Sequence, residues 1–131
     1  MKVGRILETA LYAEDLEAAE IFYTKVLGLE VHAREAGHHV FFRSGPNMFL
    51  IFNPNATEKE APGPFQHGSR GRGHVAWAAT PAELDDWQRW LEKHGVAVQP
   101  YLWPEGGRSL YFSDPAGNNL ELATPQVWKI T

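Results

Sequence analysis

The chain repeats one order of predicted elements, and this internal repeat limits the fold more than any other feature. Hydrophobic periodicity in residues 6–52 predicts a strand, a helix and three further strands, and residues 73–123 predict the same order. Residues 53–72 are rich in Pro, Gly, Asn and Gln and keep no periodicity, so we expect a linker there. The expected division is module one at 1–52, the linker at 53–72 and module two at 73–131, within a single α+β domain of two βαβββ modules.

Local capping signals support the two predicted helices. Asp15 is suited to cap the first helix, and Gly28 fits the left-handed position just after its end. The second helix begins at residues 80–83, Thr-Pro-Ala-Glu, which combine a capping box with proline at the first helical position. Its expected buried stripe consists of Leu84, Trp87, Trp90 and Leu91. The expected strands lie at 6–12, 29–33, 40–42, 48–52, 73–79, 96–98, 109–112 and 120–123.

Composition excludes several classes of function. A hydrophobic fraction of 44% with 21% charged residues is ordinary for a globular protein that buries a sizeable core. The net charge of −4 and the lack of a basic run argue against nucleic acid or an anionic membrane as a partner. With no cysteine, any metal must be held by His, Asp, Glu or water. No signal-peptide core and no apolar run of ~20 residues is present, so a cytoplasmic protein is expected.

The last predicted strand carries a carboxylate that needs a partner. Strand alternation places Glu121 on the face opposite its leucine neighbours, and such a carboxylate costs free energy unless it meets a cation, a donor or water. Aligning the two closing hairpins without a gap sets Ile51 on Glu121, and aligning the two first strands sets Glu8 on His74. Three of these four equivalent positions carry side chains that can bind a metal. The repeat therefore predicts a metal site at Glu8, His74 and Glu121, although each residue alone is equally well explained as structural.

Three stretches resemble the vicinal-oxygen-chelate superfamily, which includes glyoxalase I, bleomycin-binding proteins, fosfomycin-resistance enzymes and extradiol dioxygenases. They are Leu-Tyr-Ala-Glu-Asp-Leu at 11–16 with the following helix, Gly-His-Val-Ala at 73–76, and Tyr-Phe-Ser-Asp-Pro at 111–115 with Leu-Glu-Leu at 120–122. The resemblance implies curved mixed sheets with helices on their convex sides, and metal ligands at Glu8, His74 and Glu121. It also implies a homodimer with the site at or near the subunit interface.

The resemblance also implies a chemistry. One imidazole and two carboxylates favour a divalent metal ion (Mn, Fe, Ni, Mg or Zn), with an octahedral site that leaves positions open preferred over closed tetrahedral zinc. A small oxygenated metabolite or antibiotic would chelate this metal, as in a lyase, an isomerase, a dioxygenase or a fosfomycin-type epoxide-opening enzyme. Ile51 occupies the position at which glyoxalase I has a fourth, proton-transferring glutamate, which disfavours that activity. The alternative is a non-catalytic drug-binding resistance protein of the bleomycin-binding type.

Four further residues are candidates for contact with the substrate. We expect Arg108 and Trp103 to bind it, and His39 and Tyr111 to take part in proton transfer. The structural alternatives are an arginine paired with Glu105, an aromatic residue of a pocket wall, a loop histidine and a sheet tyrosine.

Overall fold

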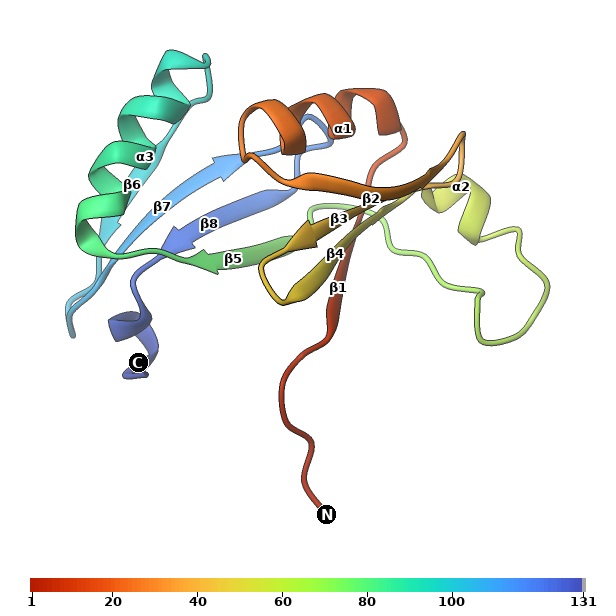
Figure 1. Ribbon diagram of the computed structural model, residues 1–131, viewed down its shortest axis with the longest axis horizontal. Coiled ribbons are helices and arrows are strands. Elements are labelled where there is room, and N and C mark those ends of the chain that lie inside the picture. The colour runs from red at the N-terminus through yellow and green to blue at the C-terminus, as the bar shows by residue number, and fades with distance from the viewer. Residues whose placement is uncertain (131) are drawn as a thin grey trace. The chain divides into compact units, whose positions relative to one another are not determined.

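The computed structural model describes residues 1–130 and divides the chain into two compact units, Met1–Gly71 and the part from Arg72 onward. The predicted α+β fold of paired βαβββ modules is confirmed, because each unit contains one four-stranded mixed sheet with a helix over one face (Figure 1). In the first unit the elements are β1 (Glu8–Tyr12), α1 (Leu16–Lys25), β2 (Glu30–Glu35), β3 (His39–Ser44), β4 (Asn47–Phe52) and α2 (Pro54–Thr57). In the second they are β5 (His74–Ala78), α3 (Pro81–Lys93), β6 (Gln99–Leu102), β7 (Arg108–Ser113), β8 (Asn119–Ala123) and the 3-10 helix η1 (Pro125–Trp128).

Both sheets have the same strand connectivity. The order is β1-β4-β3-β2 in the first unit and β5-β8-β7-β6 in the second. In each, the first strand runs parallel to the last, and the remaining pairs are antiparallel. The first and last strands of a module are therefore neighbours, which places residues far apart in the sequence on one face of the sheet.

The core of the first unit forms between α1 and its sheet. Asp15 caps the helix as predicted, since its carboxylate accepts a hydrogen bond from the backbone N–H of Ala18 at 2.9 Å. Tyr23 is fully buried, and its ring centroid lies 5.5 Å from that of Phe42 and 4.9 Å from that of Phe49. Burial of each such ring contributes roughly 1.5–3 kcal/mol, so this helix face fixes the orientation of β3 and β4.

The segment 53–72, for which we predicted a linker, contains α2 and folds back on the first unit. The hydroxyl of Tyr12 and Nδ1 of His67 lie 2.7 Å apart, and Arg70 forms ion pairs with Glu14 at 3.1 Å and with Glu58 at 2.7 Å. These contacts join side chains that the sequence separates by up to 56 residues, which explains why local composition gave no sign of them.

The core of the second unit lies beneath α3. The predicted capping box at Thr80 and Glu83 is present, and Leu84 and Leu91 are fully buried. The expected burial of Trp90 is wrong, because this side chain is 42% exposed and its ring lies 4.1 Å from that of His94 on the helix surface. The buried stripe is narrower than predicted, since Trp90 lies at its edge.

The strand predicted at 96–98 is also wrong in position. The structure forms β6 at Gln99–Leu102, where its residues pair with β7 from Gln99 opposite Tyr111 to Leu102 opposite Arg108. Proline lacks a backbone N–H, and the sheet accepts Pro100 because β6 is an edge strand. Tertiary pairing with β7 thus overrides the stronger local preference of residues 96–98 for a strand.

The two closing hairpins differ by one residue, which corrects the gapless alignment. Arg43 pairs with Met48 across four intervening residues, 44–47, whereas Ser113 pairs with Asn119 across five, 114–118. Leu50, rather than Ile51, therefore matches Glu121 in register. Ile51 is fully buried on the face that α1 covers and has no access to any site on the opposite face.

Candidate functional site

The candidate site in the second unit is a histidine and a carboxylate on neighbouring strands. His74 begins β5 opposite Asn119 of β8, and Glu121 lies two residues further along β8, so both side chains project from the same face. Nε2 of His74 is 3.3 Å from Oε2 of Glu121. Leu120 and Leu122, which flank Glu121, point into the core beneath α3 and are 0% and 4% exposed. Alternation along β8 therefore places the carboxylate of Glu121 on one face of the sheet and the two core leucines on the other.

A backbone contact fixes the orientation of the His74 ring. Nδ1 of His74 lies 2.9 Å from the carbonyl oxygen of Asn119, which can only accept a hydrogen bond, so Nδ1 carries the proton. Nε2 then faces the carboxylate of Glu121, so that a proton or a metal cation can be shared between the two groups. A carbonyl behind a histidine is also the usual arrangement at metal-binding imidazoles.

Glu121 is buried and is held from behind by a relay of donors. Its side chain is only 9% exposed, and Oε1 accepts a hydrogen bond of 2.5 Å from the hydroxyl of Ser109. The indole N–H of Trp103 donates in turn to the same hydroxyl at 2.8 Å. Tyr111 lies opposite Glu121 in the sheet. Burial, and then the hydrogen bond and charge of Glu121, raise the pKa of the Tyr111 phenol, so it remains a proton donor at neutral pH.

The turn between β7 and β8 holds the strands that carry these groups. The carboxylate of Asp114 accepts hydrogen bonds at 2.9 Å from the backbone N–H groups of Ala116 and Asn118 and from the side-chain amide of Asn118. The Asn118 side chain then accepts from the N–H of Gly73 at 2.9 Å, immediately before His74. The Asp-Pro-Ala-Gly-Asn stretch is therefore structural, and it positions the strand on which His74 lies.

Glu8 occupies the corresponding position in the first unit. It begins β1 opposite Met48, as His74 begins β5 opposite Asn119. Its side chain is exposed and projects from the face opposite α1, because it shares that face with Leu50 and Tyr12. The structure brings His74 and Glu121 together within one sheet, while the participation of Glu8 stays a prediction.

The four predicted substrate-contact residues have different surroundings. Trp103 and Tyr111 lie beside Glu121, as described above. Arg108 lies on the other face of the sheet, where its guanidinium donates to Asp85 of α3 at 2.7 Å. The alternative pairing of Arg108 with Glu105 is not formed, since Glu105 pairs with Lys129 at 3.1 Å. Binding of substrate by Arg108 stays a prediction.

His39 belongs to the first unit, on the face of the sheet opposite α1. Its ring stacks on Phe41 with centroids 4.0 Å apart. Burial first, and the neighbouring His38 second, hold the pKa of His39 below its ordinary value, so the ring is neutral at physiological pH. A neutral imidazole can act as a base or as a metal ligand, and its role in proton transfer stays a prediction.

Ser109 is the member of the site that the sequence interpretation missed. It is 1% exposed and lies two residues before Tyr111, on the same face of β7. Period-two alternation from Tyr111 would have placed it beside Glu121, but a lone serine gives no other signal.

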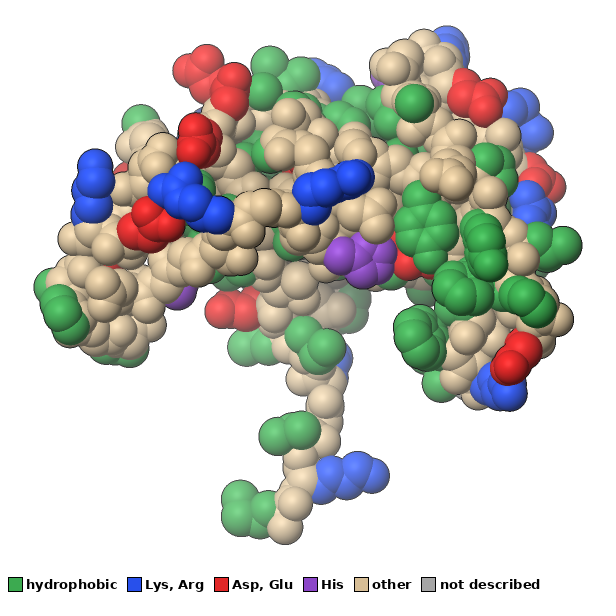
Figure 2. Space-filling model, turned by 180° about the vertical axis from the view of Figure 1, so that it is seen from behind, with side chains coloured by type: hydrophobic (Ala, Val, Ile, Leu, Met, Phe, Trp, Pro, Cys, Tyr) green, Lys and Arg blue, Asp and Glu red, His purple; other side chains and the backbone are tan. Residues whose placement is uncertain are grey.

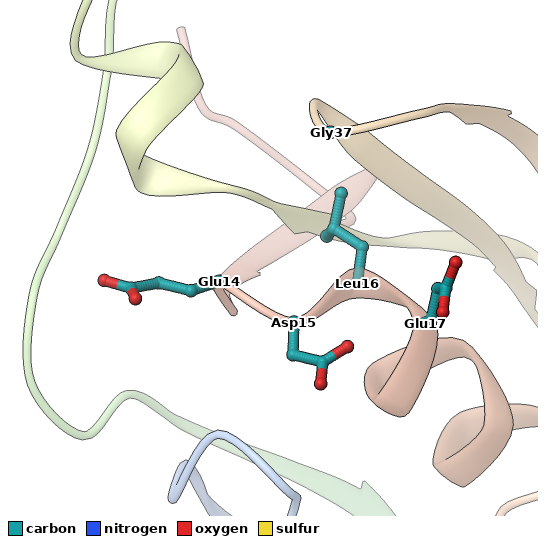
Figure 3. Close-up of a pocket in the computed structure, with 5 residues that line it drawn as sticks. All are labelled: Glu14, Asp15, Leu16, Glu17 and Gly37. Atoms are coloured by element: carbon teal, nitrogen blue, oxygen red, sulfur yellow. The ribbon is translucent and has the colours of Figure 1, made fainter.

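A hollow at the start of α1 holds several carboxylates without forming a site. It is lined by Glu14, Asp15, Leu16, Glu17 and Gly37. Figure 3 shows the carboxylates of Glu14 and Asp15 pointing away from one another, while Leu16 points towards Gly37. Glu14 pairs with Arg70 and Asp15 caps α1, so both carboxylates already have structural partners.

Comparison with known proteins identifies the family. The sequence model of the Glyoxalase/Bleomycin resistance protein/Dioxygenase superfamily matches residues 5–122. The chain belongs to this superfamily. A metapyrocatechase of Geobacillus stearothermophilus is 30% identical over 125 residues, which cover 92% of this chain and 34% of that protein. The chain thus spans about a third of the length of the curated relatives that it matches.

Solved structures of the superfamily match nearly the whole chain. A crystal structure of lactoylglutathione lyase from Agrobacterium tumefaciens is 40% identical, with a TM-score of 0.94, and the match covers 99% of this chain and 100% of that one. An integron cassette protein from the Halifax Harbour sewage outfall metagenome is 25% identical, with a TM-score of 0.76, and the match covers 93% of this chain and 99% of that one. Within residues 1–130, no helix is long and apolar enough to cross a membrane.

Proposed function

We propose that the protein is a metal-dependent enzyme whose metal is held by Glu8, His74 and Glu121. The observation that supports the proposal is the contact between an imidazole and a buried carboxylate, since Nε2 of His74 lies 3.3 Å from Oε2 of Glu121. Both are fixed from behind, by the carbonyl of Asn119 and the hydroxyl of Ser109. This support is what a metal site requires, because ligands held in place lose little freedom on binding.

The donor set fits a divalent metal ion. One neutral imidazole and two carboxylates bring about −2 charge and favour Mn²⁺, Fe²⁺, Ni²⁺ or Mg²⁺ with open positions over closed tetrahedral zinc. When bound, such a metal polarises a substrate oxygen and stabilises the negative charge that develops on it. Tyr111 supplies a protonated phenol beside this position, and Trp103 supplies an aromatic ring whose N–H holds Ser109 in place.

We infer that the substrate is a small molecule with two adjacent oxygen atoms that chelate the metal. The relatives named as a metapyrocatechase and as a lactoylglutathione lyase support a ring-cleaving or lyase reaction. Leu50 stands where the second unit has Glu121, so the first unit has no carboxylate at this position to move a proton. A lyase reaction in this protein would therefore need another base. His39 and Tyr111 remain the proposed candidates for that role.

Metal binding by the purified protein tests the proposal. After treatment with a chelator, the wild type should bind about one equivalent of Mn²⁺, Fe²⁺ or Ni²⁺ at this site, and at a hundredfold excess over Kd the metal should stabilise the fold by ~2.7 kcal/mol. Glu121→Gln keeps the size of the side chain and should weaken this binding at least about tenfold. Ser113→Ala, on the neighbouring strand β7 and away from the carboxylate, is the control.

Two outcomes would contradict the enzyme proposal. One is an affinity for these metals that is the same in the wild type and in Glu121→Gln. The other is tight binding of a cationic drug that needs no metal and is unaffected by Glu121→Ala, which supports the non-catalytic alternative. Turnover of catechols, of hemithioacetals and of epoxides should then be compared with and without metal to assign the reaction class.

We also propose that two copies of the chain associate through the second unit. Exposed apolar side chains support this, since Tyr101, Leu102 and Trp128 are 45%, 73% and 76% exposed. Figure 2 shows hydrophobic side chains gathered on one part of the surface. Light scattering should give the mass of a dimer, and Leu102→Glu should convert it to a monomer. A monomeric wild type at micromolar concentration would contradict this proposal.

A further inference from the structure

A second group of metal-binding side chains lies at the turn between β2 and β3, in the first unit. Glu35 and His39 are directly opposite one another in the antiparallel register, and His38 lies in the turn that joins them. One ligand atom from each of these three residues lies within 4.8 Å of the other two. Glu35 and His38 have no part in the site proposed above, and His39 enters it only as a candidate base, so this group needs an explanation of its own.

The two histidines face one another through their Nδ1 atoms, which are 2.8 Å apart. On the far side of His38, Nε2 lies 2.7 Å from Oε1 of Glu60. Because a carboxylate accepts, Nε2 of His38 carries a proton, and the other ring nitrogen, Nδ1, faces His39. A carboxylate on the outer nitrogen is the arrangement that orients metal-binding histidines and raises their basicity.

The spacing suits two neighbouring ligands of one cation. Nitrogen ligands at ~2.0–2.1 Å from a tetrahedral Zn²⁺ are roughly 3.4 Å apart, so the two Nδ1 atoms, 2.8 Å apart without the ion, need to separate by only about 0.5 Å. Oε2 of Glu35 lies 3.8 Å from Nδ1 of His39 and is the third potential ligand of the group. A small rotation of this exposed glutamate brings its oxygen to ligand distance.

Aromatic neighbours hold the rings in place before any cation binds. His39 stacks on Phe41 at 4.0 Å, and the rings of both histidines meet the edge or face of Phe52 at 6.1–6.2 Å. The histidine side chains are 24% and 16% exposed, which leaves a route for an ion from solvent. The group is thus fixed, accessible and rich in nitrogen.

We propose that Glu35, His38 and His39 form a second metal site, for a transition-metal dication such as Zn²⁺, with Glu60 as the carboxylate that orients His38. Two imidazole nitrogens and one carboxylate oxygen favour zinc, nickel or copper over magnesium or calcium. Both Nδ1 atoms bind the ion through their lone pairs, so the proton that lies between them is released to solvent on binding. The bound ion would tie the β2–β3 turn to the segment after α2 through Glu60. This gives His39 a role other than the proton transfer predicted from the sequence.

Zinc titration in a background without the first site tests this proposal. Calorimetry of His74→Ala/Glu121→Gln protein should still give about one equivalent of bound Zn²⁺. Adding His39→Gln should weaken that binding at least about a hundredfold, and adding Glu60→Gln should weaken it about 10–100-fold. His32→Gln is the matched control, because this exposed histidine of β2 contacts Arg43 and not the group.

A measurement on the wild type guards against variants that fail to fold. With Zn²⁺ added, the imidazole NMR signals of His38 and His39 should shift together at one equivalent or less, while those of His32 stay in place. The proposal is wrong if the double variant binds no Zn²⁺ at micromolar concentration. It is also wrong if His39→Gln binds as tightly as its parent, or if the wild-type signals do not move.

Discussion

Replacement of Ser109 by alanine should weaken both the fold and the binding of metal. The Ser109 hydroxyl is 1% exposed, donates to Glu121 at 2.5 Å and accepts from the indole of Trp103 at 2.8 Å. In Ser109→Ala, the buried carboxylate loses a donor and the indole N–H loses its acceptor.

The size of the effect follows from these two hydrogen bonds. A bond to a buried charged group is worth roughly 1.5–3 kcal/mol, and the loss of a partner by the half-buried Trp103 adds about 1 kcal/mol, since water can reach part of that ring. We therefore expect Ser109→Ala to lower the free energy of unfolding of the metal-free protein by about 2–4 kcal/mol. Because the hydroxyl also orients a proposed ligand, metal affinity should fall about 10–100-fold.

Urea denaturation of chelator-treated protein measures the first effect, and calorimetric titration with Mn²⁺ measures the second. Ser113→Ala makes the same change at an exposed position of the same strand and should stay within about 0.5 kcal/mol of the wild type. Trp103→Phe removes only the donor to Ser109 and should cost less than Ser109→Ala. If Ser109→Ala matches the Ser113→Ala control in both assays, the relay has no energetic role and the argument fails.

Four further changes have expected outcomes. Leu50→Glu supplies a carboxylate at the position equivalent to Glu121 and should tighten metal binding about tenfold or more; unchanged affinity in a titration would contradict the proposed equivalence. Thr80→Ala removes the helix cap and should lower the free energy of unfolding by about 1 kcal/mol in urea. Hydrogen bonds from the backbone N–H and then from the hydroxyl of Thr80 lower the pKa of Glu83. The ionised carboxylate therefore stabilises the fold above pH ~4.5, and this stabilisation is lost as the pH falls through the lowered pKa. The difference in melting temperature between the wild type and Glu83→Gln should disappear in acid. Gly107→Ala places a Cβ 2.7 Å from a side chain of η1, at a position whose φ is +93°. It should lower the free energy of unfolding in urea by more than about 2 kcal/mol. Gly106→Ala places its Cβ in open space and should lower it less.

Local signals in the sequence were sufficient for α1, for α3 and for most strands, but not for the short helices α2 and η1. Asp15 and the Thr80–Glu83 box act within one turn of the residues they cap, so their effect can be predicted without tertiary structure. β6 could not be predicted in this way, because its position depends on pairing with β7, and Pro100 argues against a strand when considered alone. The predicted burial of Trp90 was wrong for a related reason, since the width of a buried helix stripe depends on the sheet beneath it.

The candidate site was predicted in part. Strand alternation placed Glu121 away from the core, and the repeat linked it to His74, which the structure places 3.3 Å away. The ring contact between His38 and its neighbour was within reach of the sequence, but the contact with Glu60 joins residues 22 positions apart in the chain, and no local pattern marks it. Arg108 was predicted to bind substrate because its strand lines the site; the structure pairs it with Asp85 on the opposite face, and its contact with substrate stays a prediction.

The extra residue in the turn at 114–118 determines which side chains of β8 face the candidate site. If the preceding turn were one residue shorter, the two faces of β8 would exchange their side chains. The acid at 121 would then point into the hydrophobic core beneath α3, where the leucines now lie. Homologous chains that keep the acid but change the length of this turn must therefore compensate elsewhere in the hairpin. Annotation of such relatives by counting ligand residues alone, without comparing turn lengths, will assign activity to chains whose acid points the wrong way.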